Sequence, residues 1–160
     1  MKIFKTWLDK ILMAILVALA FALIIIIGLA VFYRYVLGAA LSWPEEVAGI
    51  IFVWYTLLGI VVLAGTKSHI AFDFVEKSTP PIVGYIVRFI SQASILVYGG
   101  VMVVYGWEYF QLFPGETTAA SGINMGWLKI SIPVAGALLV INMFLNLMIK
   151  PDSDENEVLV

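Results

Sequence analysis

The chain has 160 residues, of which 62% are hydrophobic and 12% charged, and its mean hydropathy of +1.04 excludes an ordinary soluble globular domain. A formal net charge of −2 says less than the distribution of the charges, and we expect no nucleic-acid partner. Because there is no cysteine, disulfides, thiol chemistry and iron–sulfur ligation are excluded.

The first apolar segment, Ile11–Tyr33, contains no charged residue and exceeds the roughly 20 residues that an α-helix needs to cross a bilayer. Lys2, Lys5 and Lys10 precede it, as in a secretory signal. A signal core is shorter and ends at a small-residue cleavage site, whereas the apolar run here continues beyond Ala18-Leu19-Ala20. The segment is therefore interpreted as an uncleaved membrane anchor.

Three further uncharged segments follow the first one along the chain. The predicted spans are about 11–33, 47–65, 89–107 and 130–149. We therefore expect an all-α integral membrane protein with one four-helix transmembrane domain over residues 1–150, with short interfacial helical segments between the spans. Residues 151–160 are acidic and are expected to form a disordered cytoplasmic tail.

Basic residues are distributed unequally between the two sides of the predicted membrane domain. Seven lie at the termini and the middle connection, and two lie on the other side. The seven are Lys2, Lys5, Lys10, Lys67, Lys77, Arg88 and Lys150, and the two are Arg34 and Lys129. Because cytoplasmic segments are enriched in Lys and Arg, both termini are expected in the cytoplasm. Arg34, Lys67 and Arg88 are candidate contacts for lipid phosphates, with Arg88 able to extend towards the headgroups.

The first connection, residues 34–46, ends in a pattern typical of a helix start. Ser42 is the expected N-cap, Pro44 is tolerated in the first turn, and Glu45 completes a capping box. Glu46 follows directly. Two interpretations stay open: both acids complement the helix dipole, or one of them points towards a partner protein.

The middle connection, Thr66 to about Thr79, is expected to be a cytoplasmic loop. It contains His69 and Asp73, four residues apart, which favours a structural ion pair over a gating or proton-handling role. Thr79-Pro80-Pro81 is expected to start the next helix. The third connection is expected over Glu108–Lys129.

The predicted spans contain few groups that could carry chemistry. None of the four cores has an ionisable side chain, and the single histidine cannot supply a bis-histidine haem site or a metal centre within one chain. We therefore expect no enzymatic activity, no cofactor and no proton relay. Trp54, in the middle of the second span, faces either lipid or another helix. Asn142 and Asn146 share a face of the last span and are candidates for hydrogen bonds between helices.

The segment from residue 42 onwards resembles a known family. The residues that carry the resemblance are Ser42-Trp43-Pro44-Glu45-Glu46, Phe52-Val53-Trp54, Leu58-Gly59, His69-Ile70 and Asp73. They closely resemble the small membrane subunit of tripartite ATP-independent periplasmic (TRAP) transporters. The characteristic positions would be Trp43, Glu45, Glu46, His69 and Asp73, which we interpret as interface or fold-fixing groups.

The resemblance implies a bacterial inner-membrane protein that supports a large elevator-type subunit. That subunit would import an organic acid, such as sialic acid or a C4-dicarboxylate, with sodium, after delivery by a periplasmic binding protein. Two alternatives remain: a small self-sufficient homo-oligomeric carrier, which normally needs an embedded acid, and a membrane anchor for a redox complex.

Overall fold

The computed structural model describes the backbone of residues 2–78 and 81–148, without the side chains of residues 2, 66–78, 81, 85 and 88. The described chain forms the helices α1 (Lys2–Tyr35), α2 (Pro44–Ser78), α3 (Pro81–Leu112), α4 (Gly126–Lys129) and α5 (Ser131–Met148). No strand occurs in these ranges, apart from an isolated bridge between Thr117 and Asn124. Four segments are long and apolar enough to cross a membrane, and α4 and α5 together make the fourth. The predicted all-α membrane fold is confirmed.

The helices extend beyond the apolar cores from which they were predicted. The expectation of a loop from residue 66 is wrong, because α2 continues as a helix to Ser78. Polar residues do not break a helix, and this part of the chain contains no proline or glycine before Pro80. Of the helix start predicted at Thr79-Pro80-Pro81, the first two residues lie outside the described residues, and α3 begins at Pro81, as the prediction allows. The third connection is shorter than expected, because α3 ends only at Leu112, two residues before Pro114.

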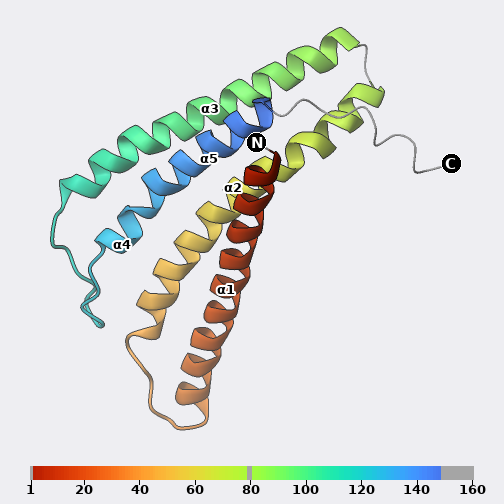
Figure 1. The fold of residues 1–160 in the computed structure, drawn as a ribbon. Coiled ribbons are helices and arrows are strands. Elements are labelled where there is room, and N and C mark those ends of the chain that lie inside the picture. Colours follow the sequence, from red (N-terminus) through yellow and green to blue (C-terminus); the bar gives the residue numbers. More distant parts are fainter. Residues whose placement is uncertain (1, 79–80, 149–160) are drawn as a thin grey trace.

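The long helices lie in a row rather than in a closed four-helix bundle. α1 packs on α2, α2 on α5, and α5 on α3, so that α2 and α5 occupy the middle (Figure 1). The buried apolar core lies along this row. It consists of Leu12 and Leu16 from α1, Leu58, Val61 and Val62 from α2, and Ala135 and Leu139 from α5.

The α3–α5 pair packs most closely, because glycines face each other across it. A Cβ atom added at Gly136 would lie 2.7 Å from Met102 Cβ and 2.9 Å from the carbonyl oxygen of Gly99. A Cβ atom at Gly106 would lie 2.9 Å from the backbone nitrogen of Pro133. Small residues at such contacts allow two helix backbones to approach each other in a membrane.

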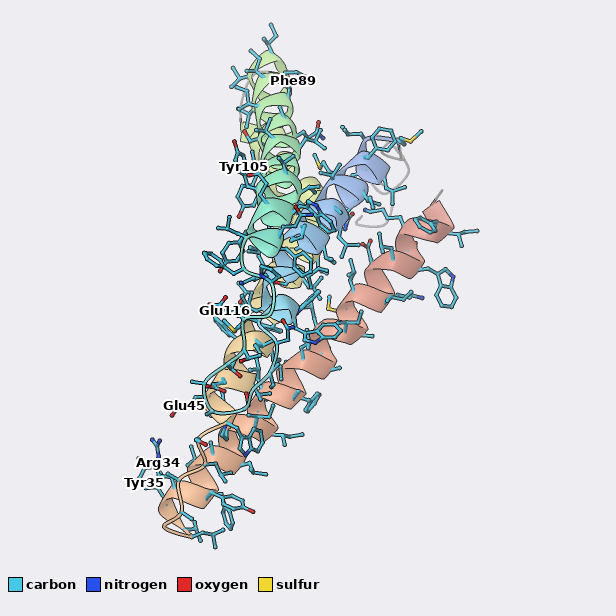
Figure 2. All side chains as sticks on the ribbon, turned by 90° about the vertical axis from the view of Figure 1, so that its left-hand side faces the viewer. Arg34, Tyr35, Glu45, Phe89, Tyr105 and Glu116 are labelled. Atoms are coloured by element: carbon cyan, nitrogen blue, oxygen red, sulfur yellow. The ribbon has the colours of Figure 1, made fainter. Side chains whose placement is uncertain are left out.

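The row leaves both of its broad faces apolar and uncovered. Phe21 and Ile24 on α1 are 61% and 67% exposed. Phe89 and Tyr105 on α3, which are labelled in Figure 2, are 65% and 64% exposed. In water such large apolar surfaces would cause association. Lipid tails are as apolar as these side chains, so a bilayer or a membrane partner can cover them without cost.

Candidate functional site

The polar contacts gather at the end of the row where the connections 36–43 and 113–125 lie. Glu46 in the first turn of α2 reaches across to the second of these connections. Its carboxylate accepts hydrogen bonds from the Ala120 amide (2.8 Å), the Ser121 amide (2.8 Å) and the Ser121 hydroxyl (2.7 Å). Both carboxylate oxygens are used, so the negative charge is met by three donors from one short segment.

The segment that binds Glu46 is held by its own hydrogen bonds. The Thr118 amide donates to the Ile123 carbonyl (2.9 Å), and the Ile123 amide donates to the Thr118 hydroxyl (3.0 Å). The Gly122 amide donates to the Thr118 carbonyl (3.1 Å), and Gly122 has the left-handed φ of 66° that closes the turn. The amides of residues 120 and 121 are therefore oriented by the turn itself towards an anion.

Lys129 is the buried cation of this end. The residue is only 1% exposed, and its ammonium donates to Glu116 Oε2 (2.6 Å) and to the Phe113 carbonyl (3.2 Å). The ammonium also lies 5.5 Å and 5.2 Å from the ring centroids of Tyr109 and Phe113. Sequence reasoning missed this site and counted Lys129 as a flanking charge. Glu116, thirteen residues earlier in the same connection, was the available signal.

Trp54 connects α2 to α4 and does not simply face lipid. Its indole nitrogen donates to the Trp127 carbonyl at 2.8 Å, and its side chain is half-buried. Of the two interpretations left open from the sequence, packing against another helix is therefore the one observed.

The predicted capping box at the start of α2 is wrong. The helix begins at Pro44, and the Trp43 carbonyl accepts the first helical hydrogen bond, from Val47 (3.2 Å). Trp43 thus takes the N-cap position, one residue later than expected, which puts Glu45 at the second helical position instead of the third. Among the described residues, no hydrogen bond of the exposed Ser42 side chain is present. Trp43 itself is 38% exposed.

The two adjacent acids of α2 have different partners. Glu46 binds the 118–123 turn, whereas Glu45 forms an ion pair with Arg34 at the end of α1, with 3.4 Å between Arg34 Nη2 and Glu45 Oε1. Both side chains of this pair are largely exposed, at 55% for Arg34 and 79% for Glu45. Glu46 is thus the partly buried attachment and Glu45 the accessible charge.

The remaining candidates from the sequence lie where side chains are outside the described set. These are Lys67, His69, Asp73 and Arg88. The backbone of α2 places His69 and Asp73 one helical turn apart, as the spacing predicted, and their pairing stays a prediction. Among the residues whose side chains are described, no cluster of three or more His, Asp or Glu residues is arranged to hold a metal ion.

The predicted amide contacts between helices are confirmed on α5. Asn142, 1% exposed, donates to the Val61 carbonyl (3.5 Å) and to Asp9 Oδ1 (3.4 Å), and Asn146 donates to the Gly65 carbonyl (3.3 Å). These contacts join α5 to α2 and to the start of α1. Each of these polar contacts ties one part of this all-α, membrane-spanning chain to another.

Comparison with known proteins shows the family to which this all-α membrane protein belongs. Residues 23–149 match the family described as tripartite ATP-independent periplasmic transporters, DctQ component. The chain belongs to this family of small TRAP permease subunits, as its resemblance predicted, and it is a transporter component rather than an enzyme.

Named relatives are similar to most of the chain. It is 24% identical over 133 residues to a TRAP transporter small permease protein of Haemophilus influenzae, covering 83% of each chain. It is 24% identical over 140 residues to the sialic acid TRAP transporter small permease protein SiaQ of Vibrio cholerae, covering 88% of this chain and 81% of that protein. It is also 26% identical over 107 residues to the sialic acid TRAP transporter permease protein SiaT of Haemophilus influenzae, covering 67% of this chain and 17% of that protein.

Proposed function

We propose that this chain is the immobile, non-catalytic subunit that supports a large elevator-type permease, and that the complex imports an organic acid with sodium ions after delivery by a periplasmic binding protein. The observation that carries the proposal is the open row of helices. Several of its polar groups make internal contacts at the loop end and in the core, while both broad faces are apolar and uncovered.

The row supports this role through its shape and stiffness. A transport domain that moves across a bilayer needs a counterpart that does not move. Additional apolar helices beside the fixed part of a permease would widen it and oppose tilting. The contacts of Glu46 with Ser121 and of Trp54 with Trp127 join the α1–α2 pair to the α3–α5 pair at one end, and we expect them to oppose sliding of one pair against the other.

The similarity to SiaT supports association with a permease. A segment similar to this chain occupies 17% of that longer permease protein. In SiaT, a sequence like this small subunit is therefore part of the same polypeptide as the rest of the permease. The apolar faces of this chain, with Phe21, Ile24 and Phe89 exposed, are the surfaces that we expect to contact the large subunit and the surrounding phospholipids.

Uptake measurements on reconstituted protein test the role. The large subunit should be reconstituted with its binding protein and a sodium gradient, with and without this chain. We expect uptake only when this chain is present, although the large subunit is inserted in equal amount in both cases. Normal sodium-dependent uptake without this chain would contradict the proposal. Flux through the chain alone would instead favour a self-sufficient carrier.

The substrate class is proposed as a carboxylate. Two relatives have sialic acid in their names, and that supports an organic acid without choosing between sialic acid and a C4-dicarboxylate. Parallel uptake of labelled sialic acid and labelled succinate, each with sodium and with potassium, decides the substrate and the coupling ion. Equal uptake in the two salts would exclude sodium coupling.

We further propose that the protein lies in the bacterial inner membrane with both termini in the cytoplasm, which the excess of basic residues on that side supports. The chain has no cysteine, so single cysteines can report the topology without background. A membrane-impermeant maleimide added to intact spheroplasts should label Ser42→Cys and leave Ser153→Cys unlabelled. The reverse result would invert the topology.

The acidic pair has a separate test in the complex. If Glu45 is the accessible partner contact, Glu45→Gln should weaken co-purification of the large subunit while leaving the fold intact. Glu108→Gln, which removes an exposed acid from α3, is the matched control. Unchanged recovery of the complex would assign Glu45 to its local contact with Arg34.

A further inference from the structure

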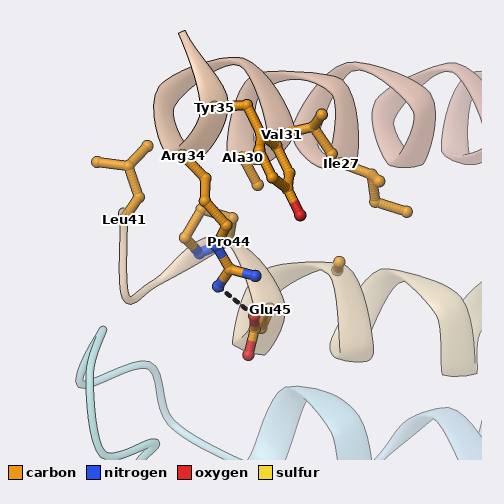
Figure 3. A pocket seen from close by; sticks show the side chains of 9 residues that line it. Ile27, Ala30, Val31, Arg34, Tyr35, Leu41, Pro44 and Glu45 are labelled. Carbon is orange, nitrogen blue, oxygen red and sulfur yellow. Dashed lines mark hydrogen bonds and ion pairs between the residues drawn. The ribbon is translucent and has the colours of Figure 1, made fainter. Parts of the chain in front are cut away.

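A groove opens between the end of α1 and the start of α2. It has a volume of about 250 Å³ and is bordered by the connection 36–43 (Figure 3). Its apolar walls include Ile27, Ala30 and Val31 from α1 and Ala48 from α2. Because pockets that enclose drug-sized ligands measure roughly 300–1,000 Å³, this groove suits a small polar headgroup whose longer apolar part lies outside it.

One end of the groove carries a charged pair. Arg34 and Glu45 face each other across it and share a single contact of 3.4 Å (Figure 3). A guanidinium has five N–H donors and a carboxylate has two acceptor oxygens. Among the described contacts, only one atom of each group is engaged, so Arg34 can also bind an anion and Glu45 a cation at the same time.

The apolar wall runs from the charged pair towards the middle of the span. Ile27 lies seven residues before Arg34 on α1, which corresponds to about 10 Å along the helix axis. Figure 3 shows Tyr35 extending from α1 towards α2 beside the charged pair. A ligand that fits is therefore charged at the helix ends, where both charge signs occur, and apolar towards the bilayer centre.

We propose that this groove binds a phospholipid with a primary ammonium headgroup, of the phosphatidylethanolamine type. The phosphate binds Arg34, the ammonium donates to Glu45, and the acyl chains run along Val31, Ala30 and Ile27. The head therefore bridges α1 and α2 at the end where Arg34 and Glu45 otherwise share a single contact of 3.4 Å. A choline headgroup has no N–H to donate to Glu45, and a glycerol headgroup brings no cation. The site does not require the transport role proposed above, and the purified chain without the large subunit tests it separately, although Glu45 is also the proposed partner contact.

The test uses native mass spectrometry of the purified full chain, delipidated and mixed with equal amounts of phosphatidylethanolamine, phosphatidylcholine and phosphatidylglycerol. We expect the ethanolamine lipid to exceed each of the other two by about fivefold, the factor for one net hydrogen bond. Equal occupancy by the three lipids would overturn the proposal.

Variants assign the selectivity to the groove. Glu45→Gln should remove the preference for ethanolamine while retaining phosphate binding, Arg34→Gln should lower all three lipids, and Ala30→Phe should do the same by filling the groove. Lys10→Gln and Glu108→Gln remove exposed charges elsewhere and should change nothing. Thermal unfolding checks that each variant is folded. A preference that survives Glu45→Gln would contradict the site.

The alternatives to a lipid in this groove are a second copy of this chain and the large subunit. A maleimide-reactive Ala48→Cys on the groove wall distinguishes them. We expect vesicles containing phosphatidylethanolamine to protect it, compared with vesicles of phosphatidylcholine alone. Protection only at high concentration of this chain, or only by the large subunit, would show a protein interface and overturn the lipid site.

Discussion

Glu46 and Ser121 are 75 positions apart in the sequence, yet two hydrogen bonds of 2.8 and 2.7 Å join the Glu46 carboxylate to the amide and hydroxyl of Ser121. The contact attaches the first turn of α2 to the connection between α3 and α4. Since α1 and α3 lie at opposite edges of the row, this contact links the two halves of the molecule at one end (Figure 1).

Replacing Glu46 with Gln should loosen this attachment. The amide side chain has one acceptor oxygen instead of two, and its NH₂ group would face the donors of residues 120 and 121. We expect faster hydrogen exchange at the amides of Ala120 and Ser121, with the core amides of α5 unchanged. Glu108→Gln is the control, since it removes an exposed acid near the end of α3. Unaltered exchange in the turn would show that its own hydrogen bonds are sufficient.

The ion pair between the buried Lys129 and the half-exposed Glu116 predicts an unequal effect of removing its two members. Glu116→Ala leaves the Lys129 ammonium buried with the Phe113 carbonyl as its remaining hydrogen-bond acceptor, and should destabilise the fold by roughly 1–3 kcal/mol. Lys129→Met keeps the unbranched side chain to within one atom of its length and removes the charge, so it should cost less. Denaturant unfolding of both variants in the same micelle measures the order. A larger loss for Lys129→Met would contradict the interpretation.

The indole contact between α2 and α4 can be removed without a large loss of apolar area. Trp54→Phe deletes the donor to the Trp127 carbonyl and should lower the free energy of unfolding by about 1 kcal/mol. Trp127→Phe is the matched variant, because it changes an exposed side chain and keeps the carbonyl acceptor. Thermal unfolding should show a lower midpoint for Trp54→Phe than for Trp127→Phe. Equal midpoints would mean that ring packing, rather than the hydrogen bond, determines the loss.

The close contact of α3 with α5 predicts opposite outcomes at two glycines. Gly136→Ala would put a methyl group 2.7 Å from Met102 Cβ and 2.9 Å from a backbone oxygen, which should destabilise the protein by about 1–3 kcal/mol. Gly100→Ala on α3 meets no atom within 4 Å and should be neutral or stabilising by about 0.5–1 kcal/mol. Unfolding midpoints in one detergent provide the comparison. A loss at Gly100 as large as at Gly136 would rule out close packing as the cause.

The helix ends show which boundaries can be predicted from the sequence pattern and which cannot. The start of α3 at Pro81 was predictable because proline fits the first helical turn. The length of α2 was not, since an uncharged core marks the part of a helix that lies in lipid and carries no information on where the helix stops. The N-cap was misplaced by one residue, because Ser42 matches a capping pattern that the fold at Pro44 does not use.

In the candidate site, too, the sequence predicted some features and missed others. Residue type singles out Glu45, Glu46 and Trp54, but it does not predict which groups they contact. Ser121 and Trp127 lie more than 70 positions from Glu46 and Trp54, and Arg34 was expected to bind lipid phosphate rather than Glu45. Lys129 was missed because a cation next to an apolar run is usually solvated or extended towards the headgroups. Its burial depends on the connection 113–125 folding over it.

The hydrophobicity of the sequence alone determined that this protein lies in a membrane and how many long helices it has. The free-energy cost of placing charge in a bilayer acts on each segment separately. The tertiary structure decided which helices are neighbours, that they form an open row, and which polar groups meet at its end. In a bilayer, helix association depends on close packing and on hydrogen bonds between distant residues, and such complementarity arises only when the helices are brought together.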